Sequence, residues 1–225
     1  MVVVFGDNLR RKRLAVATYI IAAGCAVATL VTMAPNAGAE IVRTFGFVPV
    51  DFSRHPILSL YTLITAEFIH SGLVHLVGNL IFLVAFGRSI ENLVGPVPFA
   101  AAFIGLGALS FLGSWLIGPT SQVPIIGASG ALSLLMGAYT IVFPKAKLRI
   151  IPLLRVPYLR AWQFAAAWVA LQLWDAVAVG ELAGGVAYAT HLGGFVIGLV
   201  TGSAWKEFAL DTDRLIAELT DEVSS

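Results

Sequence analysis

Long apolar stretches alternate with short polar connections along most of this chain. A bilayer core is about 30 Å thick and takes roughly 20 helical residues to cross. On this criterion we predict six transmembrane helices, at residues 14–33, 73–92, 97–117, 125–143, 161–179 and 182–205. The pattern predicts an all-α polytopic membrane protein, with a cytoplasmic segment at 1–13, a six-helix membrane domain at 14–205 and a cytoplasmic tail at 206–225.

Composition agrees with a membrane protein and excludes several other classes. The 225 residues are 58% hydrophobic and 12% charged, about half the charged fraction usual in soluble domains. The net charge is +1 and there is no long basic run, so we expect the lipid bilayer and no nucleic acid as a partner. Cys25 is the single cysteine, which excludes an internal disulfide and disfavours a thiolate metal site.

The distribution of Lys and Arg predicts the orientation. With a cytoplasmic amino terminus, Arg43 and Arg54 lie outside, and the other twelve of the 14 basic residues lie inside. This positive-inside asymmetry predicts that both termini are cytoplasmic. The first apolar stretch could instead be a cleavable signal peptide, with the basic residues 10–13 before it, but about 20 apolar residues exceed the usual signal core of 7–15.

Two regions outside the predicted spans carry further expectations. The segment 35–70 is too long for a simple connection, and its aromatic and apolar residues predict an external loop that dips into the interface. The tail after Trp205 alternates charged and apolar residues, which predicts a short amphipathic helix. The remaining acidic candidates for a polar site, Glu67, Asp175 and Glu181, are expected at membrane interfaces.

Polar residues at bilayer depth are the candidates for chemistry, because they are costly there and are usually functional. His70, His75 and His191 lie in or at the spans, and Asn79 shares a helix face with His75, four residues earlier. Ser129 lies in the turn GASG, at the head of the fourth span. A serine in such a turn is often only a helix cap, and Asn79 could serve only to link helices.

Counting helical residues places Ser129 and His191 at one depth. Each lies 15 residues before a cytoplasmic boundary, at Pro144 and Lys206, which corresponds to about 22 Å. A helix that begins at the GASG turn is too short to span alone, so its first amides lie about 8 Å inside the hydrocarbon. Such backbone is tolerated only beside protein or a water-filled cavity, and a hydrolase needs water.

Small residues predict that the fourth and sixth spans pack closely. Ser129, Ser133 and Gly137 form one stripe at intervals of four, while Gly194 and Gly198 lie on the His191 face as a G-x-x-x-G motif. This packing would let His191 act as the base that a nucleophilic serine needs. The first amides of the fourth helix, together with Asn79 and His75, could bind an oxyanion.

Four short strings in register resemble the rhomboid family of intramembrane serine proteases. They contain His70, His75 and Asn79 in HSGLVHLVGN, Gly87, Glu91 and Gly95 in GRSIENLVG, Gly127, Ser129 and Gly130 in GASG, and His191, Gly194 and Gly198 in HLGGFVIG. The resemblance covers all six predicted spans, in order. It implies a six-transmembrane-helix rhomboid-like bundle.

The resemblance also implies roles for individual residues. Ser129 would be the nucleophile and His191 the general base of a dyad without aspartate, and His75, Asn79 and the Ser129 amide would form the oxyanion hole. His70 would be structural, as would Glu91 with Arg88 near the cytoplasmic edge, and the glycines beside the site would be packing residues: Gly127, Gly130, Gly194 and Gly198. Where the family often has an aromatic residue stacked on the base, this chain has Ser133, so what orients His191 is left open.

The resemblance implies endopeptidase activity on transmembrane segments of single-span or polytopic membrane proteins, through an acyl-enzyme and with no metal or cofactor. Substrates would have small residues at the cleavage site and would enter past the fifth helix and a mobile external cap. The external loop lacks the Trp-Arg pair common in the family. One alternative is a catalytically silent rhomboid-like protein that binds membrane clients; another is a proton-coupled transporter, which no discontinuous-helix repeat supports. Size and organisation favour a prokaryotic plasma membrane.

Overall fold

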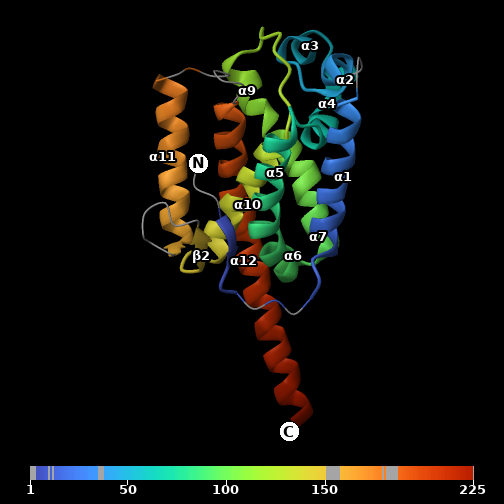
Figure 1. Cartoon of the computed structure of the whole chain (residues 1–225). Coiled ribbons are helices and arrows are strands. Elements are labelled where there is room, and N and C mark those ends of the chain that lie inside the picture. Colours follow the sequence, from blue (N-terminus) through green and yellow to red (C-terminus); the bar gives the residue numbers. More distant parts are fainter. Residues whose placement is uncertain are drawn as a thin grey trace.

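A bundle of helices makes up most of the protein, in a computed structural model that describes residues 4–9, 11, 13–34, 38–150, 158–178, 180 and 187–224, with the backbone alone for residues 5 and 211–224. Figure 1 shows α1, α11 and α12 running along the bundle with α5 and α10 between them, α2 and α3 at one end and β2 at the other. The prediction of a mostly helical protein is confirmed.

The first half of the chain contributes α1 and a cap of three shorter helices. α1 covers Val16–Thr32, and the cap consists of α2 (Gly38–Phe45), α3 (Pro49–Arg54) and α4 (Pro56–Phe68). The expectation of a loop at 35–70 was therefore wrong for most of that segment. Proline at the first position of both α3 and α4 favours helix initiation, because its missing amide hydrogen is not needed there.

Two helical rods follow, each interrupted by one π-helical turn. The first comprises α5 (Leu73–Phe82), η1 (Leu83–Gly87) and α6 (Arg88–Val94), and the second comprises α7 (Pro96–Ala101), η2 (Ala102–Leu106), α8 (Gly107–Leu109) and α9 (Phe111–Ile117). Gly95 separates them with a positive φ of 88°, which a side chain would disfavour.

The second half of the chain contributes α10 (Ser129–Val142), α11 (Ala161–Ala178) and α12 (Tyr188–Ser224). α10 starts at Ser129, as expected from the GASG turn, and its 14 residues extend for about 21 Å. α12 continues without interruption beyond Trp205, so the tail is not a separate short helix. Its amphipathic character stays a prediction, because the side chains after Leu210 lie outside the described ones.

A small antiparallel sheet at one end of the bundle is an addition that the all-α prediction did not include. β1 (Val4–Asp7), β2 (Lys147–Ile150) and β3 (Tyr158–Arg160) pair in that order. Alternate residues of β2 are buried, which is the period of a half-buried strand. The sheet covers the end of the bundle at which α10 finishes.

Asp7 fastens this amino-terminal strand to the helices. Its carboxylate accepts hydrogen bonds from Ser89 at 2.6 Å and Tyr139 at 2.7 Å, and it pairs with Arg11 at 2.7 Å. The segment before the bundle is therefore integrated with α6 and α10.

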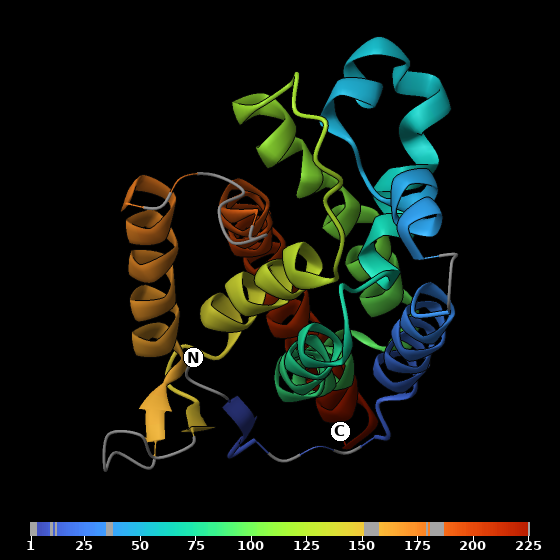
Figure 2. The same cartoon turned by 45° about the horizontal axis from the view of Figure 1, so that its top comes forward.

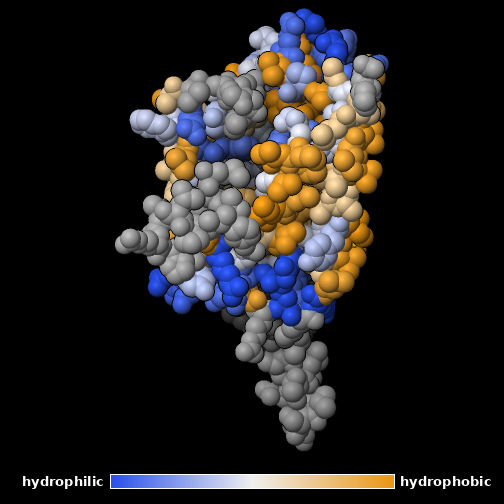
Figure 3. Space-filling view, viewed as in Figure 1, coloured by the Kyte–Doolittle hydropathy of each residue, from blue (hydrophilic) through white to orange (hydrophobic). Residues whose placement is uncertain are grey.

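The surface agrees with a membrane setting. In Figure 3 the visible hydrophobic residues lie between hydrophilic residues at the two ends of the bundle. Many large apolar side chains point outward, among them Ile20 on α1 and Val177 on α11. Among the described residues, two helices are long and apolar enough to cross a membrane, Leu73–Val94 and Pro96–Ile117, while α1, α4 and α10 are shorter apolar helices. The count of six spans stays a prediction.

Candidate active site

The turn before α10 fixes the position of Ser129. Gly127 has a φ of 116°, in the region that favours glycine, and its amide donates to the Ala66 carbonyl at 2.8 Å. A side chain on Gly127 would also meet the ring of His75, since its first carbon would lie 2.8 Å from Cε1. Glycine is thus required twice over, and it places Ser129 as the first residue of α10.

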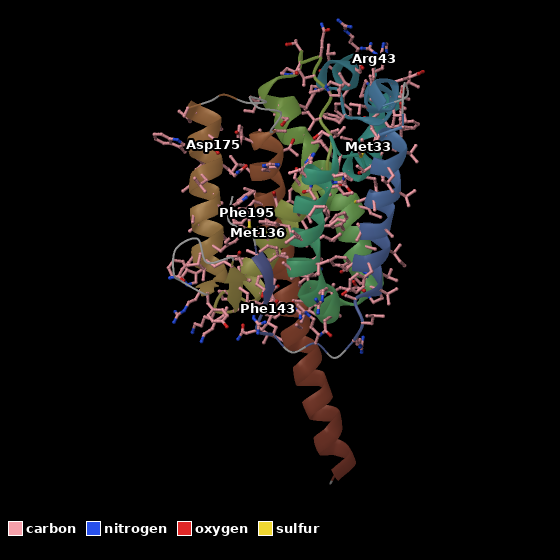
Figure 4. All side chains as sticks on the ribbon, in the orientation of Figure 1. Met33, Arg43, Met136, Phe143, Asp175 and Phe195 are labelled. Atoms are coloured by element: carbon pink, nitrogen blue, oxygen red, sulfur yellow. The ribbon has the colours of Figure 1, made fainter. Side chains whose placement is uncertain are left out.

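Ser129 and His191 form a hydrogen bond between α10 and α12. The distance from Ser129 Oγ to His191 Nε2 is 2.8 Å, and both side chains are partly buried. α10 runs from Ser129 toward Phe143 at the lower end of the bundle in Figure 4, with Met136 and Phe195 at mid-height. The pair therefore lies on the opposite side of mid-height from the sheet.

Glycines allow the two helices to approach this closely. α10 and α12 form the most extensive helix contact described. A methyl group on Gly194 would collide with the Gly130 carbonyl, and one on Gly198 would collide with the Leu134 carbonyl. The expected contact between small-residue faces is present, with backbone against backbone.

The other ring nitrogen of His191 contacts Gln172 of α11. The distance from Nδ1 to Gln172 Oε1 is 2.6 Å. Trp168, one turn earlier on the same face, lies against the His191 ring with centroids 6.0 Å apart, and it lies equally close to Phe195. Sequence reasoning missed Gln172. The available signal was an uncharged polar residue within the apolar stretch 161–179.

His75 and Asn79 approach the same turn from α5. Asn79 is buried, and its Nδ2 atom has no hydrogen-bond partner among the described residues. His75 Nδ1 accepts from the Ser71 amide at 3.4 Å and lies 3.1 Å from Ser71 Oγ. An Nδ1 that accepts leaves the ring proton on Nε2, the nitrogen next to Gly127. Two N–H donors therefore lie beside the start of α10.

His70 connects α1 to the turn, and its described hydrogen bonds do not include Ser129. Its Nδ1 lies 3.1 Å from Thr29 Oγ1, its Nε2 accepts from the Ala128 amide at 3.5 Å, and it is fully buried. Its ring packs edge-on against His75, with centroids 5.0 Å apart. His70 thus supports both the turn and its neighbouring histidine.

Glu91 lies far from Ser129 and caps α1. Its carboxylate accepts from the Ala17 amide at 2.9 Å and from the amide and hydroxyl of Thr18 at 2.7 Å each. A carboxylate at a helix amino terminus satisfies free amides and interacts favourably with the helix dipole.

The remaining candidates lie outside this arrangement. Ser133 donates to the Ser129 carbonyl at 2.7 Å. Glu67 is buried in α4, and its position at a membrane interface stays a prediction. Asp175 is partly buried in the upper part of α11 (Figure 4), and Glu181 lies outside the described residues. Within the described part of the chain, no three His, Cys, Asp or Glu side chains gather as a metal ion would require.

Comparison with known proteins shows which family this chain matches. A family model described as "Rhomboid domain" matches residues 58–207, more than half of the chain. Rhomboid protein 1, mitochondrial, of Saccharomyces cerevisiae is 30% identical over 150 residues, which cover 65% of this chain and 42% of that protein. The mitochondrial presenilin-associated rhomboid-like protein A of Danio rerio is 31% identical over 139 residues, which cover 61% of this chain and 35% of that protein.

A bacterial relative matches a shorter region. The putative rhomboid protease YdcA of Bacillus subtilis is 32% identical over 79 residues, covering 35% of this chain and 39% of that protein. The matches thus span about two fifths of each of these three relatives.

Proposed function

The chain belongs to the rhomboid family, and we propose that it is an intramembrane serine endopeptidase that cleaves transmembrane segments of other membrane proteins. The observation that carries the proposal is the 2.8 Å hydrogen bond between Ser129 Oγ and His191 Nε2, beside Asn79 Nδ2 on α5, which has no partner among the described residues. A serine within hydrogen-bond reach of a base, with donors for an oxyanion, is the arrangement that acyl transfer requires.

In the proposed reaction His191 moves one proton through each half of the cycle. Nε2 takes the proton of Ser129 as Oγ attacks the scissile carbonyl, and it then gives that proton to the leaving amine as the C–N bond breaks. An acyl-enzyme remains on Ser129. His191 then activates a water molecule, whose attack releases the new carboxyl terminus and restores the serine.

The oxyanion of each tetrahedral intermediate would be bound by His75 Nε2–H, Asn79 Nδ2 and the Ser129 amide. The first amides of a helix have no acceptor within that helix, so the start of α10 provides backbone donors where negative charge develops. Asn79 suits this role because its buried donor is otherwise unpaired within the described structure. Such donors are effective when they are already aimed at the oxyanion and shielded from water.

The membrane arrangement is part of the proposal. We infer six spans within residues 14–205, with residues 1–13 and 206–225 both on the cytoplasmic side, and substrates that are single-span or polytopic membrane proteins. The apolar outward-facing side chains of α1 and α11 support a lipid environment for the whole bundle. A prokaryotic plasma membrane stays a prediction, since relatives occur both in mitochondria and in Bacillus subtilis.

Labelling with a serine-directed fluorophosphonate tests the nucleophile directly. In liposomes the wild-type protein is expected to label, and Ser129→Ala is expected to lose the signal completely. Ser133→Ala is the matched control, because it removes a hydroxyl one turn along α10 and only a hydrogen bond to the Ser129 carbonyl. The control is expected to label at a rate within about twofold of wild type.

Two outcomes would reject the proposal. Failure of wild type to label, beside an active rhomboid protease under the same conditions, would favour the silent client-binding alternative. Retention of labelling by Ser129→Ala would show that another residue is the nucleophile. Cleavage of a fluorescent transmembrane peptide in the same liposomes then checks that a labelling-competent serine also hydrolyses peptide bonds.

A further inference from the structure

α11 contributes one polar side chain to the Ser129–His191 pair, and the sequence motifs do not include it. We propose that Gln172 is a positioning residue for this reaction, holding His191 in the tautomer and orientation in which Nε2 can take the serine proton. The proposal rests on the proposed function and extends it to a third helix.

The two contacts of His191 together assign the ring proton. A glutamine Oε1 can only accept, so the 2.6 Å contact with Nδ1 places the proton on Nδ1. Nε2 then carries a lone pair, and it accepts the Ser129 hydroxyl at 2.8 Å. In the opposite tautomer Nε2 would carry the proton and could not serve as the base. Gln172 therefore selects the reactive tautomer through a neutral acceptor.

Trp168 complements Gln172 on the same helix face. Its ring lies 6.0 Å from that of His191, with an angle of 37° between the planes. The position one turn after Ser129, which could have supplied an aromatic residue, is Ser133, and Ser133 is bonded to backbone. Apart from the hydrogen bond with Ser129, the side-chain contacts described above for the His191 ring therefore come from Gln172 and Trp168 of α11.

Gln172 is a polar side chain in a half of α11 that is otherwise largely exposed. α11 stands at the edge of the bundle in both Figure 1 and Figure 2. Its buried residues, Ala161, Phe164 and Ala165, all lie in its first two turns, while Trp174 and Val177 beyond Gln172 are largely exposed. A polar side chain on a lipid-facing helix half is costly unless it is paired. The hydrogen bond to His191 satisfies that requirement for Gln172.

The test compares three variants by the rate of fluorophosphonate labelling in liposomes between pH 5 and 9. Gln172→Met removes the acceptor at nearly constant size and is expected to lower the rate about tenfold, the ratio expected from losing one buried hydrogen bond. Gln163→Met is the matched control on the same helix, at an exposed glutamine that accepts from the Arg160 amide. Its rate is expected to match wild type.

Gln172→Glu separates positioning from a merely structural role. A carboxylate still accepts from Nδ1, so the maximal rate is expected to stay within about twofold of wild type. It also stabilises the protonated imidazole, which is inactive as a base, so the acidic limb of the pH profile is expected to move upward by about one pH unit. A residue that only packs would not give this pairing of a slow Gln172→Met with a maximal rate restored in Gln172→Glu.

The tautomer can also be read without any change at Gln172. The chain has four histidines, so nitrogen-15 NMR of labelled histidine in liposomes resolves each ring, and His191→Gln identifies the signals of His191. Wild type is expected to carry the proton on Nδ1, and Gln172→Met to show a mixture of tautomers. An Nε2-protonated His191 in wild type would overturn the proposal.

The kinetic outcomes distinguish this proposal from the proposed function. If Ser129→Ala abolishes labelling but Gln172→Met labels as fast as Gln163→Met, the role of Gln172 is refuted and the endopeptidase proposal stands. If Gln172→Glu is as slow as Gln172→Met at every pH, Gln172 does not act as an acceptor, and the proposal is again refuted. If wild type does not label, the proposed function fails, while the NMR measurement still decides the tautomer.

Discussion

The contact between Gly198 and Leu134 predicts that one methyl group, placed seven residues from His191, will impair the proposed active site. In Gly198→Ala the new Cβ would lie 2.8 Å from both the Cα and the carbonyl carbon of Leu134. Ordinary contacts of a Cβ begin near 3.4 Å, and the Leu134 carbonyl oxygen would lie closer still than these two carbons, so the helices must separate by at least about 0.6 Å. Backbone atoms cannot rotate away as a flexible side chain could.

That separation acts directly on the Ser129–His191 distance. Because α10 and α12 carry the two residues, a displacement of about 0.6 Å or more lengthens the 2.8 Å hydrogen bond to about 3.4 Å or beyond. A misplacement of about 1 Å can cost roughly a hundredfold in rate, so we expect a 10- to 100-fold loss for a shift of this order. Overpacking should also lower the free energy of unfolding by about 1–3 kcal/mol.

Gly193→Ala provides the matched control. It makes the same substitution on the same helix, five residues nearer to His191, but its Cβ would make ordinary contacts, with the Ser110 carbonyl oxygen at 3.4 Å and the Gly113 Cα at 3.7 Å. Fluorophosphonate labelling rates in liposomes, with thermal unfolding of the same samples, compare the two variants. The reasoning is refuted if Gly198→Ala labels as fast as wild type, or if Gly193→Ala is the slower of the two.

Two further predictions concern the donor side of the site and the cap of α1. Asn79→Ala is expected to reduce turnover of a transmembrane peptide by about 10²–10³-fold with little change in KM, because an oxyanion donor acts mainly in the transition state; a change confined to KM would contradict that role. Glu91→Gln, which weakens three hydrogen bonds to Ala17 and Thr18, is expected to lower thermal stability by about 1–3 kcal/mol while a correctly folded fraction still labels at the wild-type rate. The exposed Glu40→Gln is its control, and equal stability of the two variants would refute the capping argument.

Local signals in the sequence predicted the elements that carry Ser129 and His191. The GASG turn indicated the helix start at Ser129, because glycine is required where the backbone has a positive φ and where His75 packs against it. Small residues at intervals of four indicated the close α10–α12 contact. Each of these signals depends on backbone geometry or helical periodicity, which short stretches of sequence express directly.

The features that were missed depend on length criteria or on distant packing. α4 is 13 residues long and therefore failed the test for a membrane span, although Pro56 marks its start. The alternating strand β2 is only four residues long, and its pairing with β1 joins segments about 140 residues apart. Gln172 was visible as a polar residue, but its contact with His191 depends on how α11 rotates and docks, which periodicity alone does not determine.

Two kinds of contact hold His191: backbone packing between α10 and α12, and a side-chain hydrogen bond to α11. Its distance to Ser129 is set by backbone packed against backbone along α10 and α12, which can change only if whole helices move. Its tautomer is set by one side-chain hydrogen bond, to Gln172 of α11. The carboxyl-terminal half of that helix is largely exposed. Experiments should therefore be able to separate the effect of the helix packing from the effect of the Gln172 hydrogen bond. Gly198→Ala should slow labelling at every pH without moving the profile, whereas Gln172→Glu should move the profile at a nearly unchanged maximal rate, so the site's geometry and its protonation are governed by different helices.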